Sequence, residues 1–227
     1  MARSREKQKE SSGADASADR ARALEIVPAA PKVVERLDRF AVLVRQWQSR
    51  INLIGDSTLA QLWTRHIADS LQLLALAPAA KIWIDLGSGA GFPGLVIACA
   101  LAGQTGVRVH LVESNAKKAA FLREAVRQLG VPAEVHAERA ETFIAAFQGR
   151  ADVVTARALA PLAELLEMAA PLFKTGAKGL FPKGQDVEVE LTQAAKCWTI
   201  ESTLVPSRTS PSGRIVVIQS AERHGRR

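Results

Sequence analysis

The sequence contains no tyrosine and only two cysteines. Without tyrosine, every mechanism that needs a phenolic acid or base is excluded. The cysteines, Cys99 and Cys197, have no metal-like spacing, so we expect a reducing, cytoplasmic location. The histidines are scattered along the chain, and for that reason we predict no zinc or other metal site. They are His66, His110, His136 and His224.

Long apolar runs are also missing. The longest, Leu95–Ala102, has eight residues, far fewer than the ~20 that span a bilayer. No apolar stretch follows the basic residues near the start, so we expect neither a secretory signal nor a membrane partner. Hydrophobic residues make up 48% of the 227 positions. This content supports a sizeable core in one domain with flanking segments and excludes a fully disordered chain.

Positive charge exceeds negative charge, with a formal net charge of +7. Residues 1–22 contribute net +2 (six basic, four acidic) and residues 222–227 another +2 (three basic, one acidic). The remaining body therefore carries 7 − 2 − 2 = +3. A net positive charge is typical of proteins that bind a polyanion. Here more than half of the excess positive charge lies in the two tails, where it could equally serve solubility.

Composition and apolar periodicity divide the chain into four segments. We predict a disordered tail at residues 1–22, a helical cap at 23–78, a core at 79–221 and a basic tail at 222–227. An amphipathic helix begins near Pro31, and a second helical stretch covers about 58–74. The apolar stripe of the first helix consists of Val33, Leu37, Phe40, Val44 and Trp47.

Short apolar runs alternate with helical patterns from residue 81 onward. This alternation predicts an α/β fold with a seven-stranded, mainly parallel sheet covered on both faces. A Pro/Ser/Gly loop at 206–213 joins the last two strands, so we expect the last strand to be antiparallel. The predicted strands are 82–86, 107–112, 133–137, 153–156, 179–182, 200–205 and 215–219. The predicted helices of this part are about 94–102, 116–129, 139–147, 161–170 and 186–196.

A glycine-rich loop lies between the first predicted strand and the next helix. It reads Asp85-Leu-Gly87-Ser-Gly89-Ala-Gly91-Phe92-Pro93-Gly94. Glycines let the backbone turn sharply and approach a ligand, here at the carboxyl ends of the strands. Two spacings overlap: the first three glycines match the S-adenosylmethionine loop of Rossmann-like methyltransferases, and the last three match a dinucleotide fingerprint.

Two features favour S-adenosylmethionine over a nicotinamide dinucleotide, and a third, Glu113, indicates a ribose without distinguishing the two cofactors. Glu113 closes the second strand, where a carboxylate would accept hydrogen bonds from a ribose diol of either cofactor. Asp85 before the first glycine is common in methyltransferase loops only. A short-chain dehydrogenase would need a tyrosine, and a larger one would need a second domain. Other interpretations remain open: Glu113 could be a solvated residue at the end of a strand, and Asp85 could cap the loop. An NAD(P)-dependent oxidoreductase remains an alternative function.

Methyltransferases that act on different acceptor atoms contain different characteristic residues, and these indicate which atom receives the methyl group here. Cys99 and Cys197 have apolar or unsuitable neighbours and read as core thiols, which disfavours cytosine-C5 chemistry. The Asn/Asp-Pro-Pro-aromatic turn of exocyclic-amine enzymes is missing after the fourth strand. Guanine N7 carries a lone pair and no proton, so its methylation needs no general base and can depend on alignment alone.

Basic residues at the ends of strands four and five are the candidate substrate contacts. Arg157 and Lys183 follow those strands, and we predict that they position the substrate. Arg65 and His66 in the cap are further candidates for contact with RNA. Each residue alone could be a solvated surface charge. Together, beside a cofactor loop, they favour a bound anion or nucleobase.

From about residue 47 to 219 the sequence resembles the glucose-inhibited division protein B family of bacterial 16S rRNA guanine-N7 methyltransferases. The resemblance is carried by Trp47 with Asn52-Leu53, by Arg65-His66-Ile-x-Asp69-Ser70 and by the glycine loop ending in Phe92-Pro93-Gly94. It continues through Lys117-x-x-x-Phe121-Leu122, Arg139-Ala140-Glu141, Arg157-Ala158 and Lys183-Gly184.

The resemblance implies a class I methyltransferase fold and a target guanine, guanine 527, in the decoding-region loop of 16S rRNA. It implies cofactor contacts at Gly87, Phe92, Ala140, Glu141 and Arg157, with Glu113 near the ribose; Asp85 and Gly89 of the loop complete our predicted set.

Two positions depart from the family pattern, Gln48 and Ile54, and both lie in the cap. We expect 16S rRNA or the small subunit as partner and a monomeric protein. A non-catalytic RNA-binding module is the remaining alternative.

Overall fold

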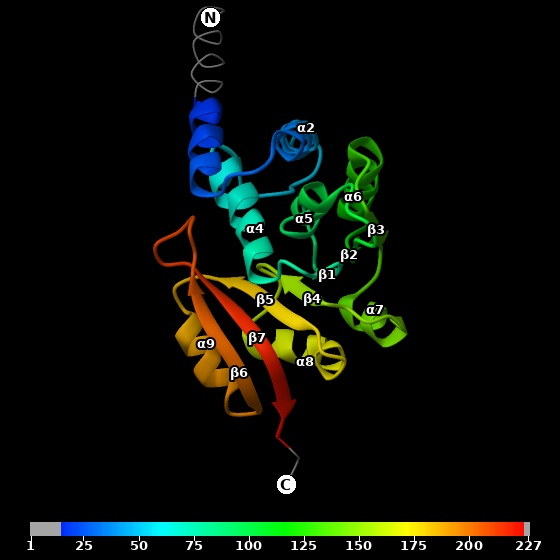
Figure 1. Cartoon of the computed structure of the whole chain (residues 1–227), viewed down its shortest axis with the longest axis vertical. Helices are drawn as coiled ribbons and strands as arrows, with labels where there is room; N and C mark the ends of the chain where they lie inside the picture. The colour runs from blue at the N-terminus through cyan, green and yellow to red at the C-terminus, as the bar shows by residue number, and fades with distance from the viewer. Residues whose placement is uncertain (1–14, 225–227) are drawn as a thin grey trace, which may run out of the picture.

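The computed structural model describes residues 15–224, which form one seven-stranded sheet between two layers of helices (Figure 1). The strands are β1 (Ile82–Leu86), β2 (Arg108–Val112), β3 (Ala133–His136), β4 (Val153–Ala156), β5 (Lys178–Lys183), β6 (Trp198–Pro206) and β7 (Arg214–Arg223). The helices of the first part are α2 (Pro31–Gln48), α3 (Asp56–Leu59), the π-helix η1 (Trp63–Ala68), α4 (Asp69–Leu71) and the 3₁₀-helix η2 (Gln72–Leu76). Those of the second part are α5 (Gly94–Leu101), α6 (Ala116–Leu129), α7 (Ala140–Ala146), α8 (Leu162–Lys174) and α9 (Val187–Ala194).

The strand order is β3-β2-β1-β4-β5-β7-β6. The first five strands run parallel, whereas β7 is antiparallel to both β5 and β6. The prediction of a mainly parallel sheet with an antiparallel last strand is therefore confirmed. The strand order reverses next to β1, and in such sheets the ligand crevice forms at the carboxyl ends of the strands on either side of that point.

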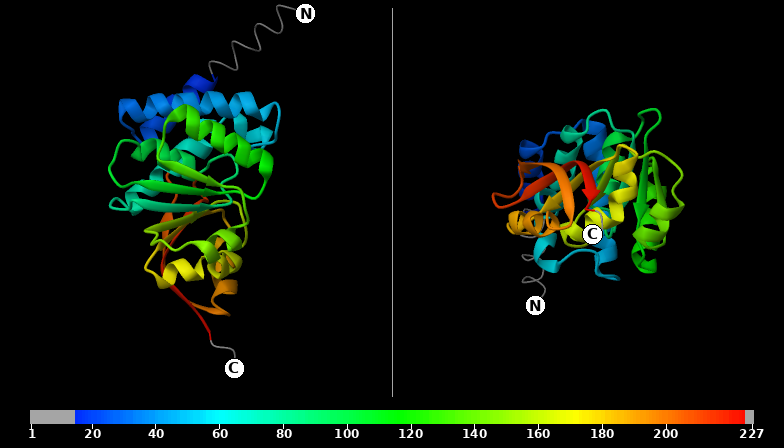
Figure 2. Two further views of the ribbon diagram at one scale, coloured as in Figure 1. Left: turned by 90° about the vertical axis from the view of Figure 1, so that its right-hand side faces the viewer. Right: turned by 90° about the horizontal axis from the view of Figure 1, so that it is seen from below.

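Alternating side chains of each central strand build two separate cores. Trp83 belongs to the core under α2, α5 and α6, and its neighbour Ile84 belongs to the core under α7, α8 and α9. Figure 2 shows the two helical layers on opposite faces of the sheet. Apolar residues of the cap, among them Phe40 and Ile67, belong to the same core as Trp83. The cap is thus packed onto the sheet's first layer rather than forming a core of its own.

The predicted disordered tail is wrong for residues 15–22, because residues 15–26 are helical. The side chain of Ala23 is buried in the first core. Arg20 pairs with Asp38 of α2 at 2.7 Å, and Asp19 Oδ2 accepts a hydrogen bond from the Trp63 backbone N–H at 2.8 Å. Two distant contacts, which no local pattern reveals, fix this short helix. Residues 1–14 lie outside the described part of the chain.

The second cap helix is not continuous, in contrast to the prediction for 58–74. It divides into α3, η1, α4 and η2. Asp19 explains where η1 begins, since its carboxylate accepts hydrogen bonds from the N–H groups of Trp63 and Thr64, the first two residues of η1. This is the role of an N-cap residue, supplied from another part of the chain.

The predicted basic tail at 222–227 also begins too early. Glu222 and Arg223 are the last residues of β7, which pairs with β6 up to that point. Residues 225–227 are outside the described range. No helix within residues 15–224 combines the length and the apolar character that a membrane crossing requires.

Candidate active site

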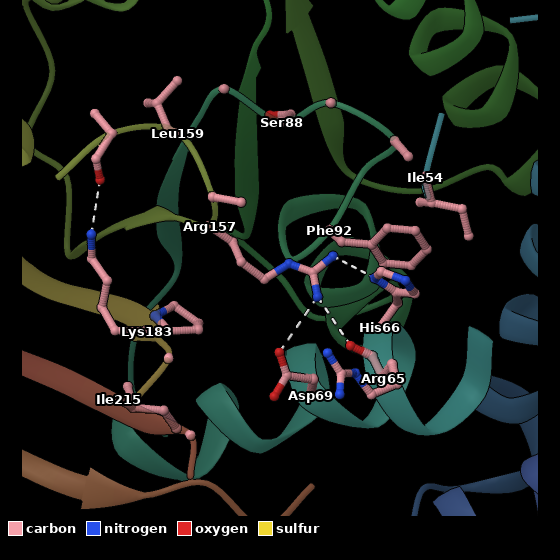
Figure 3. A pocket seen from close by; sticks show the side chains of 18 of the residues that line it. Ile54, Arg65, His66, Asp69, Ser88, Phe92, Arg157, Leu159, Lys183 and Ile215 are labelled. Atoms are coloured by element: carbon pink, nitrogen blue, oxygen red, sulfur yellow. Dashed lines mark hydrogen bonds and ion pairs between the residues drawn. The ribbon is translucent and has the colours of Figure 1, made fainter. Parts of the chain in front are cut away.

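A cleft of about 1070 Å³ opens at the carboxyl ends of the parallel strands. Its walls come from the loop after β1, the ends of β2, β4 and β5, the cap, and the loop between β6 and β7 (Figure 3). Cavities that bind cofactors are usually ~300–1,000 Å³, so this one has room for a nucleoside cofactor beside a nucleobase. Of the predicted site residues, those lining the cleft are Arg65, His66, Gly87, Gly89, Phe92, Glu113, Arg157 and Lys183.

The glycine loop forms one wall and depends on backbone that only glycine adopts easily. Gly87 and Gly89 have φ values of +65° and +54°, in the left-handed region that disfavours other side chains. A Cβ on Gly87 would lie 2.6 Å from Leu159 Cδ1 in the loop after β4. The two loops therefore touch at this point, and the exposed backbone of the glycine loop faces the cleft.

Asp85 does not belong to this wall, although we predicted it as a cofactor contact. Its side chain is buried, accepts a hydrogen bond from Thr155 Oγ1 at 2.7 Å and accepts another from the Gly94 N–H at 3.1 Å. Burial raises the pKa of Asp85 to about 6, against the lowering effect of its hydrogen bonds. The carboxylate ties β1 to β4 and to the start of α5, so it shapes the loop from below.

Glu113 presents a carboxylate to the cleft directly after β2. It accepts hydrogen bonds from the N–H groups of Gly89 at 2.8 Å and Asn115 at 2.7 Å. A carboxylate has about four acceptor positions, so positions remain for two hydroxyl groups. The backbone hydrogen bonds hold the carboxylate in place next to the glycine loop. This arrangement fits a ribose diol and favours the cofactor interpretation over a solvated strand end.

Arg157 crosses the cleft from the end of β4 to the cap (Figure 3). Its guanidinium donates to the Arg65 carbonyl at 3.1 Å and to His66 Nδ1 at 2.7 Å, and it lies 3.5 Å from Asp69 Oδ2. The same group lies 5.4 Å from the centre of the Phe92 ring, within the range of a cation–π interaction. Arg157 thus joins the cap, the glycine loop and the sheet.

The contacts of His66 define its protonation. Arginine only donates, so His66 Nδ1 accepts from Arg157 and the ring proton sits on Nε2, which donates to Thr58 Oγ1 at 2.9 Å. Burial, followed by the charges of Arg157 and Arg65, lowers the pKa of His66 to about 3. His66 is therefore a neutral ring with both nitrogens engaged.

Lys183 points back to its own side of the cleft. Its Nζ donates to the Ala160 carbonyl at 2.8 Å and pairs with Glu190 Oε2 at 2.7 Å. Glu190 also accepts from the Leu162 N–H at 2.6 Å. The pair therefore fixes the segment that follows Arg157. We predicted that Lys183 positions the substrate; the structure shows its ammonium paired with an acidic side chain, and the predicted role stays a prediction.

Sequence reasoning did not assign a role to Asp69 or Glu190. Asp69 Oδ1 accepts from Thr209 Oγ1 at 2.7 Å and from Gln72 Nε2 at 2.9 Å, so it connects the cap to the β6–β7 loop. Asp69 is part of the Arg-His-Ile-x-Asp-Ser run, but Thr209 is some 140 positions away. Glu190 carries no local signal, since an acidic residue in the first turn of a helix is common.

Ala140 and Glu141 begin α7 beyond the end of β3. Neither is among the residues of the described chain that line the cleft. Their predicted contact with the cofactor therefore remains a prediction.

Comparisons with known proteins show the family. The GidB family profile, described as rRNA small subunit methyltransferase G, matches residues 33–214. Curated relatives called ribosomal RNA small subunit methyltransferase G include one from Bradyrhizobium sp. strain BTAi1, 57% identical over 92% of this chain and 94% of the relative. Another, from Nitrobacter hamburgensis, is 58% identical over 92% of this chain and 81% of the relative.

Solved structures share the fold at low sequence identity. Magnesium protoporphyrin IX methyltransferase from Synechocystis PCC 6803, solved with bound SAM, aligns with a TM-score of 0.53 and 15% identity over 85% of this chain and 99% of the other. Cofactor-bound Rv0187 from MTB aligns with a TM-score of 0.55 and 15% identity, covering 86% and 93% of the two chains.

Proposed function

Because the chain belongs to the rRNA small subunit methyltransferase G family, we propose that it methylates N7 of a guanine in 16S rRNA, with guanine 527 of the decoding-region loop as the target. The protein is an S-adenosylmethionine-dependent rRNA methyltransferase. Family membership thus decides between the two cofactors that the overlapping glycine spacings left open. The finer proposal concerns the acceptor atom and its position in the rRNA.

The observation that carries the proposal is the pairing of two unlike walls in one cleft. The glycine loop and the Glu113 carboxylate suit a nucleoside with a ribose diol. Opposite them are the cap and the loop after β4, with Arg65 and Arg157. A cofactor held on the first wall would face a base held by the second.

S-adenosylmethionine, when bound, supplies an electrophilic methyl group on a sulfonium centre. The chain's own residues would orient the two reactants. Glu113 would accept hydrogen bonds from the ribose hydroxyls, and the bare backbone at Gly89, which lines the cleft, would allow close approach. Arg157, fixed by His66 and Asp69, would hold the loop after β4 against the bound base. Alignment of this kind can supply much of the rate enhancement.

The polar groups of the cleft support an acceptor that needs no deprotonation. His66, the only histidine among the lining residues of the described chain, has both nitrogens engaged and a pKa of about 3. The carboxylates of Asp69 and Glu190 already accept hydrogen bonds from their neighbours. A guanine N7 carries no proton to remove, so it suits a site in which these three side chains are occupied and Glu113 is assigned to the ribose.

We also propose a cytoplasmic monomer as the active form, since the cleft is built from one chain and the substrate is ribosomal. Size-exclusion chromatography with light scattering tests the monomer.

The decisive experiment transfers a labelled methyl group to small ribosomal subunits and, separately, to purified 16S rRNA. We expect label in 16S rRNA, with strand scission specific for N7-methylguanine at position 527. Scission at another guanine would overturn the proposed position, and label without scission would overturn N7. Binding of S-adenosylhomocysteine without any transfer to either substrate would favour a non-catalytic RNA-binding module.

A further inference from the structure

Two of the scattered histidines meet at the edge of the sheet. His110 of β2 stands opposite Glu134 of β3 in the strand register, and His136 is two residues further on. His110 Nδ1 lies 3.0 Å from His136 Nε2 and 4.0 Å from Glu134 Oε2. The ligand atoms of the three side chains all lie within 4.8 Å of one another. Within residues 15–224, this is the one such group of potential metal ligands.

We propose that His110, Glu134 and His136 bind a divalent transition metal ion of the zinc class. Two imidazole nitrogens and one carboxylate oxygen form a donor set that zinc uses, with water in the fourth position. Zinc–nitrogen bonds of ~2.0–2.1 Å separate two nitrogens of a tetrahedral site by roughly 3.4 Å. The observed 3.0 Å between His110 Nδ1 and His136 Nε2 is within a few tenths of an ångström of that separation.

The mobility that binding needs belongs to Glu134. Its side chain is 57% exposed, whereas that of His110 is 8% exposed. A half-exposed glutamate can change rotamer and bring its oxygen to the ion. The histidines have less freedom to move, because aromatic rings pack against them: Phe143 lies 4.5 Å from His136, and Phe147 lies 5.3 Å from His110, between ring centres.

The site is separate from the methyl-transfer cleft, since none of the three residues lines it. It is nonetheless close to the cofactor wall, the side of the cleft formed by the glycine loop and Glu113. The His136 carbonyl accepts a hydrogen bond from the backbone N–H of Glu113 at 3.0 Å. An ion would join β2 to β3 immediately before the strand end that carries Glu113. The expected consequence is a more stable sheet edge, because a ligand that binds the native state stabilises it by mass action.

The test titrates Zn²⁺ and Co²⁺ into untagged, chelator-treated protein. We expect one Zn²⁺ per chain by calorimetry, a Co²⁺ spectrum of tetrahedral type with nitrogen and oxygen ligands, and a higher midpoint of thermal unfolding with metal. Glu134→Gln and His136→Gln should each weaken Zn²⁺ binding at least tenfold. His224→Gln and Glu201→Gln, which change an exposed histidine and an exposed glutamate of β6, serve as matched controls and should bind Zn²⁺ like the wild type.

Circular dichroism and S-adenosylhomocysteine binding establish that each variant is folded, so that weaker Zn²⁺ binding reports on the ligand. Zn²⁺ binding that survives both ligand substitutions would overturn the proposal. An absence of binding in Cys197→Ser would also overturn it, because the ion would then sit at the Cys197 thiol, which is exposed and not in the core as we predicted. If the wild type binds neither ion, the two histidines form a hydrogen-bonded pair only. Methyl-transfer activity enters none of these outcomes.

Discussion

The two walls of the cleft are built in different ways. The cofactor wall comes from one short stretch, the glycine loop, together with Glu113, and its groups are held by backbone hydrogen bonds. The opposite wall is assembled from the cap, the loop after β4, the end of β5 and the β6–β7 loop. Side chains such as Arg157 and Asp69 hold these segments to one another.

The two predicted substrate cations show what this difference means. Arg157 and Lys183 both stand at the carboxyl ends of neighbouring strands, yet Arg157 reaches across to the cap while Lys183 turns to Glu190 and the Ala160 carbonyl. The first connects two segments, and the second fixes one of them. On this assembled wall, these basic residues bond to other parts of the protein. We therefore expect substitution of their bonding partners to affect turnover as much as substitution of the basic residues themselves.

The largest expected effect concerns the cofactor wall. A Cβ on Gly94 would lie 2.5 Å from Leu111 Cδ2 and 2.6 Å from Asp85 Oδ2, and these neighbours are buried. We expect Gly94→Ala to lower the free energy of unfolding by about 3 kcal/mol, measured by urea denaturation. Gly184→Ala is the control, since a Cβ there has no atom within 4 Å, and it should change stability little. Equal stability of the two variants would mean that the loop adapts and the wall is not rigid.

Glu113→Ala should weaken S-adenosylmethionine binding about ten- to a hundredfold, because hydrogen bonds to a charged acceptor contribute about 1.5–3 kcal/mol. Calorimetry on the folded variant measures it. Glu188→Ala is the matched control, since Glu188 of α9 is exposed, does not line the cleft and has no predicted role. If Glu141→Ala weakens binding more than Glu113→Ala does, the cofactor extends to α7 as the family resemblance implied.

The two walls also differ in how far the sequence predicts them. The sheet, the glycine loop and Glu113 follow from local periodicity and from the rule that parallel strands end at one edge. The bonds of Arg157 to His66 and of Asp69 to Thr209 join residues some 90 and 140 positions apart, and no spacing reveals them. The same reason explains the helix at 15–26, which Asp38 and Trp63 hold in place.

On the assembled wall, Lys183→Met should lower turnover at saturating RNA and cofactor roughly tenfold, about 1.4 kcal/mol, with little change in salt dependence. Glu190→Gln should cause a similar decrease, because both residues hold the same segment, and the double variant should be far from additive. Lys196→Met, which changes an exposed lysine of no assigned role, is the control. Normal turnover in Glu190→Gln together with a large decrease in Lys183→Met would mean that Lys183 acts on the substrate directly.

The contact between Arg157 and His66 predicts a pH dependence of stability. The pKa of His66 is about 3 in the folded protein and 6.5 ordinarily, so the unfolded chain binds the extra proton between these values. Stability from this group is complete above pH 6.5 and is lost as the pH falls toward 3. We expect the wild type to lose about 1.7 kcal/mol more than His66→Gln between pH 6.5 and pH 5, measured by urea denaturation. Parallel curves would show that His66 is protonated in the folded state.

The smallest effect is expected outside both walls, at the N-terminus. Residues 1–14 carry four basic and two acidic side chains, net +2, so their deletion should weaken RNA binding modestly. The salt slope should flatten by about one unit for each phosphate group that the shortened protein no longer neutralises. Turnover at saturating RNA should stay the same, because both walls of the cleft remain. Deleting residues 1–22 removes no further net charge but takes away the hydrogen bonds of Asp19 and the ion pair of Arg20.

The longer deletion should therefore give the same salt slope with a lower free energy of unfolding, by about 1–2 kcal/mol. Filter binding at several salt concentrations and urea denaturation separate the two effects. If the shorter deletion already lowers stability or turnover, the first fourteen residues contribute to the folded cap, and the N-terminus does more than supply charge.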